Sequence, residues 1–492
     1  MEDNSLPGAD PRSRSPDPER SEGETAAERM PRPVGLKSGD RVHIVGIGGA
    51  GMSAIATVLL ERGYRVSGSD QVESPSTQAL RSRGAQVHIG HRAENVGEVD
   101  HVLISSAIKS DNVELAAAQR RGIPVSKRAQ FLGWLMQGAF GVAVAGTHGK
   151  TTTTAMIASI LARTGRDPSF IVGGTITGLN TPAHAGRGRE FVIEADEYDR
   201  AFLGLTPAVA VVTNVEHDHP DCYPTFESML DAFRAFVGLL PESGLLVLCG
   251  DDAPARSLME YRGSRDVVTF GFGRDVTWQA TDLRVNNTGG ADFVVLRDGV
   301  TRGLLRLRVP GRHNVLNALA AVAATDFLGL SIEQVREALV EFLGVGRRFE
   351  LRGEACGVTV VDDYGHHPTE IRATLAAARM TYPGRAIWAV WQPHTFSRTK
   401  LLLDEFAAAF EDADHVIVTE VYASREKDTL GVTAGAVVKR MRHRDSRHAA
   451  SLLDATNMLA DGVQAGDVVI TLSAGDGNVV GDSLLRRLEE RC

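Results

Sequence analysis

The sequence has few cysteines, no excess of basic residues and no long apolar run, and each absence excludes a class of protein. Its four cysteines include no Cys-x-x-Cys pair, so they indicate neither a zinc ribbon nor a disulfide framework. With 53 basic and 62 acidic side chains, the net charge of -9 argues against a general nucleic-acid-binding protein. No apolar run approaches the ~20 residues of a membrane-spanning helix, and the N-terminal segment lacks the apolar stretch of a secretory signal. We therefore expect a cytoplasmic protein in a reducing compartment, with neither nucleic acid nor a membrane as partner.

The length of 492 residues exceeds what one hydrophobic core usually supports, and at ~150 residues per domain it predicts roughly three domains. Residues 1–38 are rich in Pro, Ser, Glu and Arg and almost devoid of apolar side chains, so we expect a disordered tail. Beyond the tail, short apolar runs alternate with helical patterns, which is the rhythm of parallel βαβ units. Residues 277–309 instead alternate apolar and polar side chains, which predicts antiparallel strands. The expected domains span residues 39–140, 141–346 and 347–492.

A glycine-rich motif, Gly46-Ile-Gly48-Gly-Ala-Gly51, directly follows a predicted strand and precedes a helical pattern. Gly46 allows a tight turn, and Gly48 lets the backbone approach a pyrophosphate at the N-terminus of the helix. Asp70 ends the next predicted strand, where its carboxylate could bind a ribose hydroxyl. The ligand stays open at this point, because NAD and UDP both carry a ribose and a pyrophosphate. An NAD-dependent oxidoreductase is therefore one interpretation.

A second motif, Gly146-Thr-His-Gly149-Lys150-Thr151, lies between another predicted strand and helix. Lys150 could reach the terminal phosphates of a nucleotide, and the Thr151 hydroxyl could bind Mg²⁺. Backbone amides near Gly149 could hold phosphate oxygens. The strict pattern would place its first glycine at Val144, but the Gly-Lys-Thr core is complete. The motif predicts binding of ATP with Mg²⁺, either for catalysis or in a non-catalytic protein that the nucleotide gates.

Polar clusters end the next two predicted strands, one at Glu194-Ala-Asp196-Glu197 and one at Asn214-Val-Glu216-His-Asp-His219. Ligands of α/β proteins bind where parallel strands end, and carboxylate oxygens suit Mg²⁺. A lone histidine is more often a surface or capping residue. His219 is a candidate metal ligand because it shares this strand end with several acids.

Two further features point to a nucleotide. Asn314 and Asn317 are three residues apart, so they share one face of a predicted helix and could together bind the edge of a base. Asn314 by itself would be interpreted as a helix cap. Arg348 offers a planar guanidinium to a phosphate that is being transferred.

Taken together and in this order, the motifs resemble the Mur ligase family. The resemblance rests on Gly-Thr-His-Gly-Lys-Thr-Thr, Glu-Ala-Asp-Glu, Asn-Val-Glu-His-Asp-His, His-Asn-x-x-Asn-Ala, Arg-Arg-Phe-Glu and Asp-Asp-Tyr-Gly-His-His-Pro, and it covers the chain beyond the tail. It implies an α/β fold of three domains. These are a Rossmann-like N-terminal domain, a central P-loop ATPase-like domain with a parallel sheet plus a small antiparallel sheet, and a Rossmann-like C-terminal domain.

The resemblance also implies a reaction: ATP-dependent ligation of L-alanine, through an acyl phosphate, to the lactyl carboxylate of UDP-N-acetylmuramate in peptidoglycan synthesis. The segment Trp391-Gln-Pro-His-Thr-Phe-Ser-Arg398 is similar to the member that adds L-alanine. A murein peptide ligase, which adds a whole peptide to the same acceptor, is the alternative within the family. The sequence departs from the family at three places, with Trp391 for a frequent Phe, Ser424-Arg425 for Ala-Gly, and Ser473 for Gly.

Site residues follow from the resemblance by matching position to position. Asn314 and Asn317 would contact adenine, Asp363 the ribose of ATP, and Arg348 its phosphate. The expected catalytic residues are Lys150, Glu194, His219 and Arg348, and the expected metal site is Thr151, Glu194 and His219. The expected ATP site is Gly146, Thr147, His148, Gly149, Lys150, Thr151, Thr152, Asn314, Asn317, Arg348 and Asp363. The expected UDP-sugar site is Gly46, Gly48, Gly49, Gly51, Met52, Asp70, Ser105 and Ser106. The expected residues at the amino-acid end are His367 and Arg398.

Overall fold

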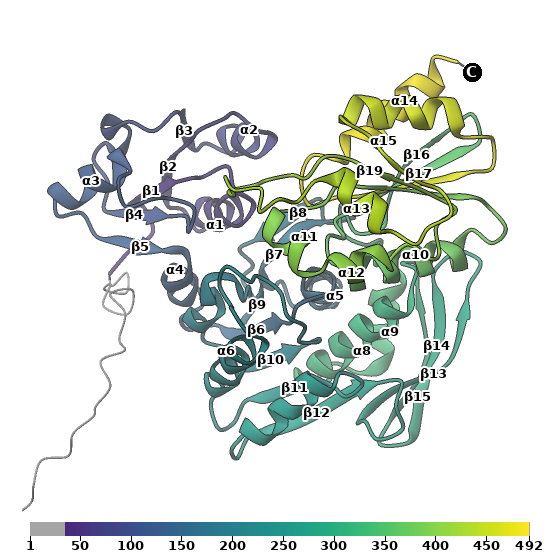
Figure 1. Cartoon of the computed structure of the whole chain (residues 1–492). Coiled ribbons are helices and arrows are strands. Elements are labelled where there is room, and N and C mark those ends of the chain that lie inside the picture. The colour runs from purple at the N-terminus through teal and green to yellow at the C-terminus, as the bar shows by residue number, and fades with distance from the viewer. Residues whose placement is uncertain (1–34, 492) are drawn as a thin grey trace, which may run out of the picture.

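Residues 35–491 of the computed structural model are described, and their strands form three sheets in three lobes (Figure 1). The tail predicted for residues 1–38 lies outside the described residues as far as position 34. Within the described part of the chain, no helix has the length and apolar character needed to cross a bilayer. The three-domain α/β prediction is confirmed, whereas the exact domain bounds stay a prediction.

The first lobe is a Rossmann-like sheet whose five strands are all parallel, in the order β3-β2-β1-β4-β5. The chain order reverses between β1 and β4, so the glycine-rich loop after β1 opens at the switch point where such folds bind nucleotides. The strands are β1 (Arg41–Val45), β2 (Arg65–Asp70), β3 (Gln86–Ile89), β4 (His101–Ile104) and β5 (Val125–Lys127). The helices are α1 (Ala50–Glu61), α2 (Pro75–Ser82), η2 (Ala93–Val96), α3 (Val113–Arg120) and α4 (Arg128–Leu135).

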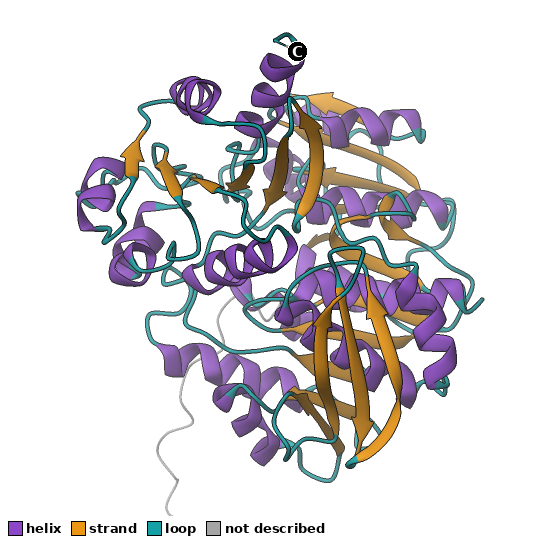
Figure 2. Cartoon of the chain, turned by 90° about the vertical axis from the view of Figure 1, so that its right-hand side faces the viewer, coloured by secondary structure: helices purple, strands orange, loops and turns teal. Residues whose placement is uncertain are grey.

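The central lobe contains one ten-stranded sheet, in the order β15-β14-β13-β12-β11-β10-β6-β9-β7-β8. The predicted antiparallel strands are present as β13–β15, and they extend the parallel sheet because β13 pairs with β12 in parallel (Figure 2). The strands are β6 (Phe140–Ala145), β7 (Ser169–Ile176), β8 (Thr181–His184), β9 (Glu190–Glu194), β10 (Val209–Val212), β11 (Leu245–Cys249), β12 (Asp266–Gly271), β13 (Trp278–Val285), β14 (Ala291–Arg297) and β15 (Val300–Leu307). The helices are α5 (Lys150–Arg163), η3 (Tyr198–Gly204), α6 (Phe226–Gly238), α7 (Ala253–Ser257), η4 (Leu258–Tyr261), α8 (Arg312–Phe327) and α9 (Ile332–Val340).

The third lobe has a six-stranded sheet in the order β16-β17-β21-β18-β19-β20, parallel except for β16. Trp391, one of the three departures from the family, ends β18 fully buried and stacked on Phe406 at 4.6 Å, so its larger ring fills the core. The strands are β16 (Glu350–Ala355), β17 (Val358–Asp363), β18 (Ile387–Trp391), β19 (His415–Val418), β20 (Ser446–His448) and β21 (Val468–Leu472). The helices are α10 (Pro368–Thr381), α11 (Phe396–Leu401), α12 (Leu403–Ala407), α13 (Ala434–Arg440), α14 (Leu452–Gly462) and α15 (Val479–Glu489).

The first lobe rests on the central lobe through two helices. Helix α1 packs against β7 and β8, and its last residue, Glu61, accepts hydrogen bonds from the Ala185 amide at 2.7 Å and pairs with His184 at 3.0 Å. Helix α4 packs against η3 so closely that a Cβ on Gly133 would lie 2.0 Å from the carbonyl oxygen of Gly204. The lobes therefore meet by direct backbone approach as well as by ion pairs.

We expect Gly133→Ala to destabilise the protein by about 1–3 kcal/mol or more, because the added methyl group overlaps a backbone carbonyl that cannot rotate away. Urea unfolding followed by circular dichroism measures the change. Gly238→Ala is the control, since that glycine lies in helix α6 with open space around its Cβ position. If Gly133→Ala, like Gly238→Ala, unfolded at the same urea concentration as wild type, the result would contradict the close contact between Gly133 and Gly204.

Candidate active site

The phosphate-binding loop joins β6 to α5 and is shaped by Gly149, whose φ of +81° favours glycine. A Cβ at Gly149 would lie 2.5 Å from the side-chain oxygen of Asn317 on α8. The neighbouring strand end holds the loop in place, because the Thr147 amide donates to the Asn214 carbonyl at 3.1 Å and the His148 amide to the Asn214 side chain at 2.8 Å. The loop is thus fixed before any phosphate arrives.

Lys150 and Thr151 begin α5 and contact two acids, Glu194 at the end of β9 and Glu197 directly before η3. The Lys150 ammonium donates to Glu197 at 2.9 Å and to the carbonyl of Thr147 at 3.1 Å. Burial opposes its charge, but the carboxylates of Glu197 and Glu194 hold the pKa of Lys150 above its ordinary value. The Thr151 hydroxyl lies 3.0 Å from both carboxylate oxygens of Glu194. The predicted cation and the predicted metal ligands therefore share one end of the sheet.

His148 links the loop to the third lobe. Its Nδ1 lies 3.1 Å from Glu370 on α10, and its Nε2 lies 3.3 Å from Glu216 after β10. Burial disfavours a charged imidazole, yet the hydrogen bonds and charges of these two carboxylates raise the pKa of His148 to about 9. Burial would also disfavour an ionised Glu216, but His148 lowers the pKa of that carboxyl to about 2. An imidazolium thus joins two carboxylates from different lobes.

A cavity of about 300 Å³ opens beside the loop. It collects most of the predicted ATP site, and its lining includes His148, Gly149, Thr151, Thr152, Asn314, Asn317, Arg348 and Asp363. On its α8 wall, Asn317 donates to the Asn314 side chain at 3.1 Å, and Asn314 donates to the Pro310 carbonyl at 2.6 Å. The pair predicted from spacing is one hydrogen-bonded unit, which fixes the orientation of both amides.

The third lobe supplies the opposite wall of this cavity. Arg348 lies 3.8 Å from Glu370, and its guanidinium is 5.0 Å from the ring centre of Tyr364. Asp363 accepts hydrogen bonds from the amides of Phe349 at 2.8 Å and Gly365 at 2.7 Å. Burial raises the pKa of Asp363 to about 6, although these amides and Arg348 oppose the rise.

The predicted UDP-sugar residues gather at the switch point of the first lobe. Asp70 accepts a hydrogen bond from the Gly48 amide at 2.8 Å, and a Cβ at Gly46 would lie 3.2 Å from that of Ser105. Arg128, which sequence reasoning missed, covers this loop: a Cβ at Gly51 would lie 2.9 Å from its guanidinium. Arg128 also pairs with Asp196 of the central lobe at 2.8 Å. Its position could have indicated this role, because Arg128 directly follows β5 and parallel strands β1 and β5 end on the same side of the sheet.

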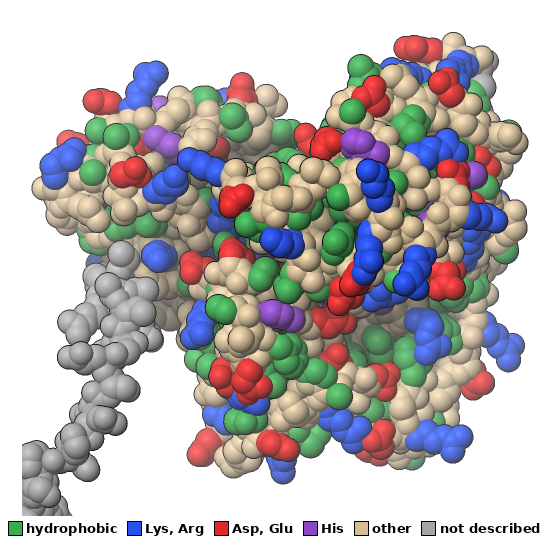
Figure 3. Space-filling model, in the orientation of Figure 1, with side chains coloured by type: hydrophobic (Ala, Val, Ile, Leu, Met, Phe, Trp, Pro, Cys, Tyr) green, Lys and Arg blue, Asp and Glu red, His purple; other side chains and the backbone are tan. Residues whose placement is uncertain are grey.

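A larger cavity of about 630 Å³ lies where the three lobes meet. Its lining includes predicted residues from each lobe, namely Ser106, His219 and Arg398. Arg398 is almost fully buried and binds Asp218 at 2.8 Å, so it also joins the third lobe to the central one. Figure 3 shows acidic, basic and histidine side chains crowding the line between these two lobes. Charged side chains from all three lobes therefore contribute to the lining of this space.

Two predicted roles lack support from direct contacts: that of His219 as a metal ligand and that of His367 at the amino-acid end. His219 lies 3.7 Å from Glu197 and from Asp218, and within residues 35–491 it forms no ion pair or hydrogen bond with Glu194. Among residues 35–491, the group of three whose ligand atoms lie within 4.8 Å of one another is instead His148, Glu216 and His367. His367 caps α10 and is buried beside His148, outside the lining of both cavities. The assigned roles of these residues stay predictions.

Three family profiles match the three lobes in order. The profile described as Mur ligase family, catalytic domain, matches residues 41–139; the Mur ligase middle domain matches 144–325; and the Mur ligase, glutamate ligase domain, matches 347–475. Among curated proteins, the chain is 45% identical over 453 residues to the UDP-N-acetylmuramate–L-alanine ligase of Geobacter sp. (strain M21), covering 92% of this chain and 98% of that one. It is 47% identical over 440 residues to the ligase of the same name from Salinibacter ruber, covering 89% and 92%.

Solved structures agree with these matches. The UDP-N-acetylmuramate-alanine ligase of Thermotoga maritima superposes with a TM-score of 0.80 at 30% identity, covering 92% of this chain and all of that one. A murein peptide ligase from Psychrobacter arcticus superposes with a TM-score of 0.71 at 27% identity, covering 92% and 99%.

We expect protein stability to depend on His148 between about pH 6.5 and pH 9. A folded-state pKa raised above the ordinary value stabilises the protein fully below about pH 6.5, and this contribution disappears as the pH rises through about 9. Its size is on the order of 3 kcal/mol. His148→Gln should therefore melt at a lower temperature than wild type near pH 6.5, with the difference shrinking toward pH 9.

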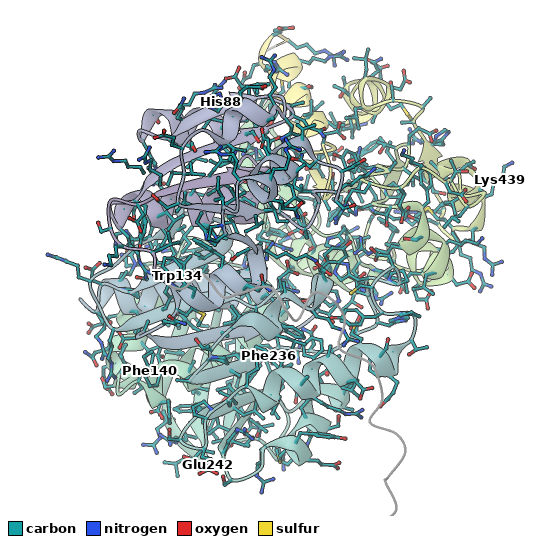
Figure 4. All side chains as sticks on the ribbon, turned by 90° about the vertical axis from the view of Figure 1, so that its left-hand side faces the viewer. His88, Trp134, Phe140, Phe236, Glu242 and Lys439 are labelled. Carbon is teal, nitrogen blue, oxygen red and sulfur yellow. The ribbon has the colours of Figure 1, made fainter. Side chains whose placement is uncertain are left out.

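Melting temperatures measured across this pH range test the prediction. His88→Gln is the control, because His88 lies on β3 of the first lobe, away from this interface (Figure 4). It should melt in parallel with wild type at every pH. A His148→Gln variant that also did so would contradict a charged imidazole between the two carboxylates.

Proposed function

The chain belongs to the Mur ligase family, and from this premise we propose that it joins L-alanine to the lactyl carboxylate of UDP-N-acetylmuramate. ATP is the co-substrate, the reaction is ADP-forming and passes through an acyl phosphate, and its product is a precursor of peptidoglycan. One observation carries the proposal: the phosphate-binding loop lies between the two cavities. His148 and Thr151 line the smaller cavity, while Lys150 contacts Glu197, which lies 3.7 Å from His219 in the lining of the larger one.

The first half of the reaction brings two anions together, because a carboxylate oxygen attacks the γ-phosphorus of ATP, the bond from that phosphorus to the bridging oxygen breaks, and ADP is the leaving group. The protein must therefore place positive charge around the phosphoryl group as it moves. Lys150 and Arg348 are the cations proposed for this task. Both side chains are partly buried, with 13% of Lys150 and 28% of Arg348 exposed, and an electrostatic contact is stronger there than in bulk water. Asn314 and Asn317 hold the adenine, and Asp363 the ribose, at the far end of the nucleotide.

Magnesium fits the residues beside the loop. Glu194 accepts hydrogen bonds from the Thr151 hydroxyl at 3.0 Å and the Gly173 amide at 2.8 Å, and among residues 35–491 it forms no direct ion pair, although Lys150 and Arg348 are near enough to interact with its charge. Hard oxygen donors with free lone pairs are the ligands that Mg²⁺ prefers. We propose that Thr151 and Glu194 hold the ion, with His219 as a further ligand or a partner of its waters. When bound, the ion neutralises phosphate charge during transfer.

The second half takes place in the larger cavity. The amine of L-alanine attacks the acyl carbon, the bond to phosphate breaks, and inorganic phosphate leaves together with ADP. The acyl phosphate must be kept from water in the meantime. Arg398, buried against Asp218, fixes the third lobe over the central one at this point. The UDP part would lie along Gly46–Gly51 of the first lobe, under Arg128.

The relatives favour L-alanine over a peptide as the nucleophile. Curated relatives at 43–47% identity bear the L-alanine ligase name, whereas the superposed murein peptide ligase is 27% identical. An oxidoreductase function would not explain the Gly-Lys-Thr motif or the two clusters of acidic residues at the strand ends. The cytoplasmic location and the absence of nucleic-acid or membrane partners stay predictions.

The deciding experiment measures phosphate release from ATP and Mg²⁺ in the presence of UDP-N-acetylmuramate, with and without single amino acids. We expect release only when L-alanine and the sugar nucleotide are both present. Release that requires a peptide in place of a single amino acid would assign the protein as a peptide ligase. Tight binding of ATP without release in any mixture would favour a nucleotide-gated binding protein and end the catalytic proposal.

Lys150→Gln should lower kcat by a factor of roughly 10²–10³, the usual cost of removing one preorganised group that stabilises transition-state charge. Single-turnover phosphate release measures it. The variant must first melt within a few degrees of wild type, since Glu197 loses its buried partner. Lys439→Gln is the matched control, because Figure 4 shows Lys439 projecting from the outside of the third lobe. A folded Lys150→Gln variant with kcat within tenfold of wild type would exclude a role for the ammonium in transfer.

A further inference from the structure

Arg425 lines the larger cavity but has no task in the reaction described above. It lies in the loop between β19 and α13, within the Ser424-Arg425 pair that replaces the Ala-Gly frequent in the family. The substitution adds a long cationic side chain where a glycine would add nothing. Its contacts show what that side chain can bind.

The loop that carries Arg425 is firmly built. The next residue, Glu426, accepts hydrogen bonds from the amides of Phe396 at 2.5 Å and Ser397 at 3.1 Å, and so binds the first turn of α11. On the other side of Arg425, the Thr395 amide donates to the carbonyl of Tyr422 at 2.9 Å. The backbone on both sides of Arg425 is therefore tied to the segment that also carries Arg398.

The side chain of Arg425 reaches from the third lobe to the central one. Its guanidinium carbon lies 4.9 Å from the ring centre of Tyr198 on η3. The Tyr198 hydroxyl donates to Asp221 at 3.0 Å, and its ring is 5.0 Å from that of His219. Arg425 thus ends beside Tyr198, which with His219 and Asp221 lines the larger cavity, where the second half of the proposed reaction takes place. A cation above an aromatic face is held in place while its N–H groups stay available.

Arg425 differs in its partners from the two other arginines that line this cavity. Arg128 is paired with Asp196 and Arg398 with Asp218, each at 2.8 Å. For Arg425, no hydrogen bond or ion pair exists within residues 35–491. Its neighbour Glu426 is already engaged by the amides of α11. An anion that enters the cavity therefore finds in Arg425 a guanidinium whose N–H donors are not in use.

We propose that Arg425 binds the α-carboxylate of the incoming L-alanine. This inference rests on the proposed ligase function and adds a specificity residue to it. The α-carboxylate keeps its negative charge from binding to product, so it needs a cation that the phosphates do not use. The lactyl carboxylate, in contrast, becomes phosphorylated and lies toward Lys150. A guanidinium matches a carboxylate with two parallel hydrogen bonds, which also orients the amine for attack.

Arg425→Gln tests the proposal in the full-length protein through steady-state kinetics with ATP, Mg²⁺ and UDP-N-acetylmuramate. We expect KM for L-alanine to rise tenfold or more, with KM for ATP and for the sugar nucleotide within twofold of wild type. Arg425→Lys should recover part of the loss, since it keeps the charge without the planar fork. Arg442→Gln is the matched control, an exposed arginine of the same lobe without a hydrogen bond or ion pair in the described chain, and it should leave all three KM values unchanged.

L-Alaninamide gives a readout that a merely structural role would not move. Wild type should use it far less well than L-alanine, because the amide lacks the carboxylate charge. In Arg425→Gln this preference, measured as the ratio of kcat/KM values, should shrink by about the same factor as KM for L-alanine rises. An unchanged preference, or a rise in KM for the sugar nucleotide alone, would overturn the proposal. Wild-type turnover with L-alanine tests the ligase function separately, so failure of that function is distinguishable from failure of this inference.

Discussion

The imidazolium of His148, held between Glu216 and Glu370, is the contact on which the nucleotide cavity depends. Glu216 and Glu370 come from different lobes and lie close to the same imidazole, so they would repel one another without its positive charge. This imidazole belongs to a residue of the phosphate-binding loop, which lies 222 residues from Glu370 in the sequence. The loop that receives the anionic nucleotide is therefore also the element that keeps the third lobe closed over it.

Sequence reasoning was strongest where chemistry follows from local order. The strand-loop-helix context of Lys150 and the strand-end position of Glu194 predicted neighbours, and the structure places Glu194 next to Thr151. The spacing of Asn314 and Asn317 predicted a shared helix face, and the two side chains are bonded to each other. Lys150, Thr151 and Glu194 meet because parallel strands end on one side of a sheet, whereas Asn314 and Asn317 meet because residues three apart share one face of a helix.

The contacts that escaped sequence reasoning lie between lobes. No local pattern indicates that Glu370 reaches His148 or that Arg128 pairs with Asp196, since both contacts depend on how separately folded lobes dock. The continuous ten-stranded sheet has a similar cause. Alternation correctly indicated antiparallel strands, but only the parallel pairing of β12 with β13 joins them to the nucleotide-binding sheet. The docking of lobes and the pairing of edge strands depend on tertiary contacts, which the periodicity of a single segment does not encode.

The packing of helix α1 on β7 and β8 has a consequence for how the protein stays in solution. Strand β8 is the last strand of the ten-stranded sheet, and an end strand presents unpaired backbone groups on which another chain could add. Helix α1 and the Glu61 contacts with His184 and Ala185 cover this region. The first lobe therefore shields the β8 edge from pairing with a strand of another molecule. A chain that loses this lobe loses a substrate site and at the same time gains an edge prone to aggregation.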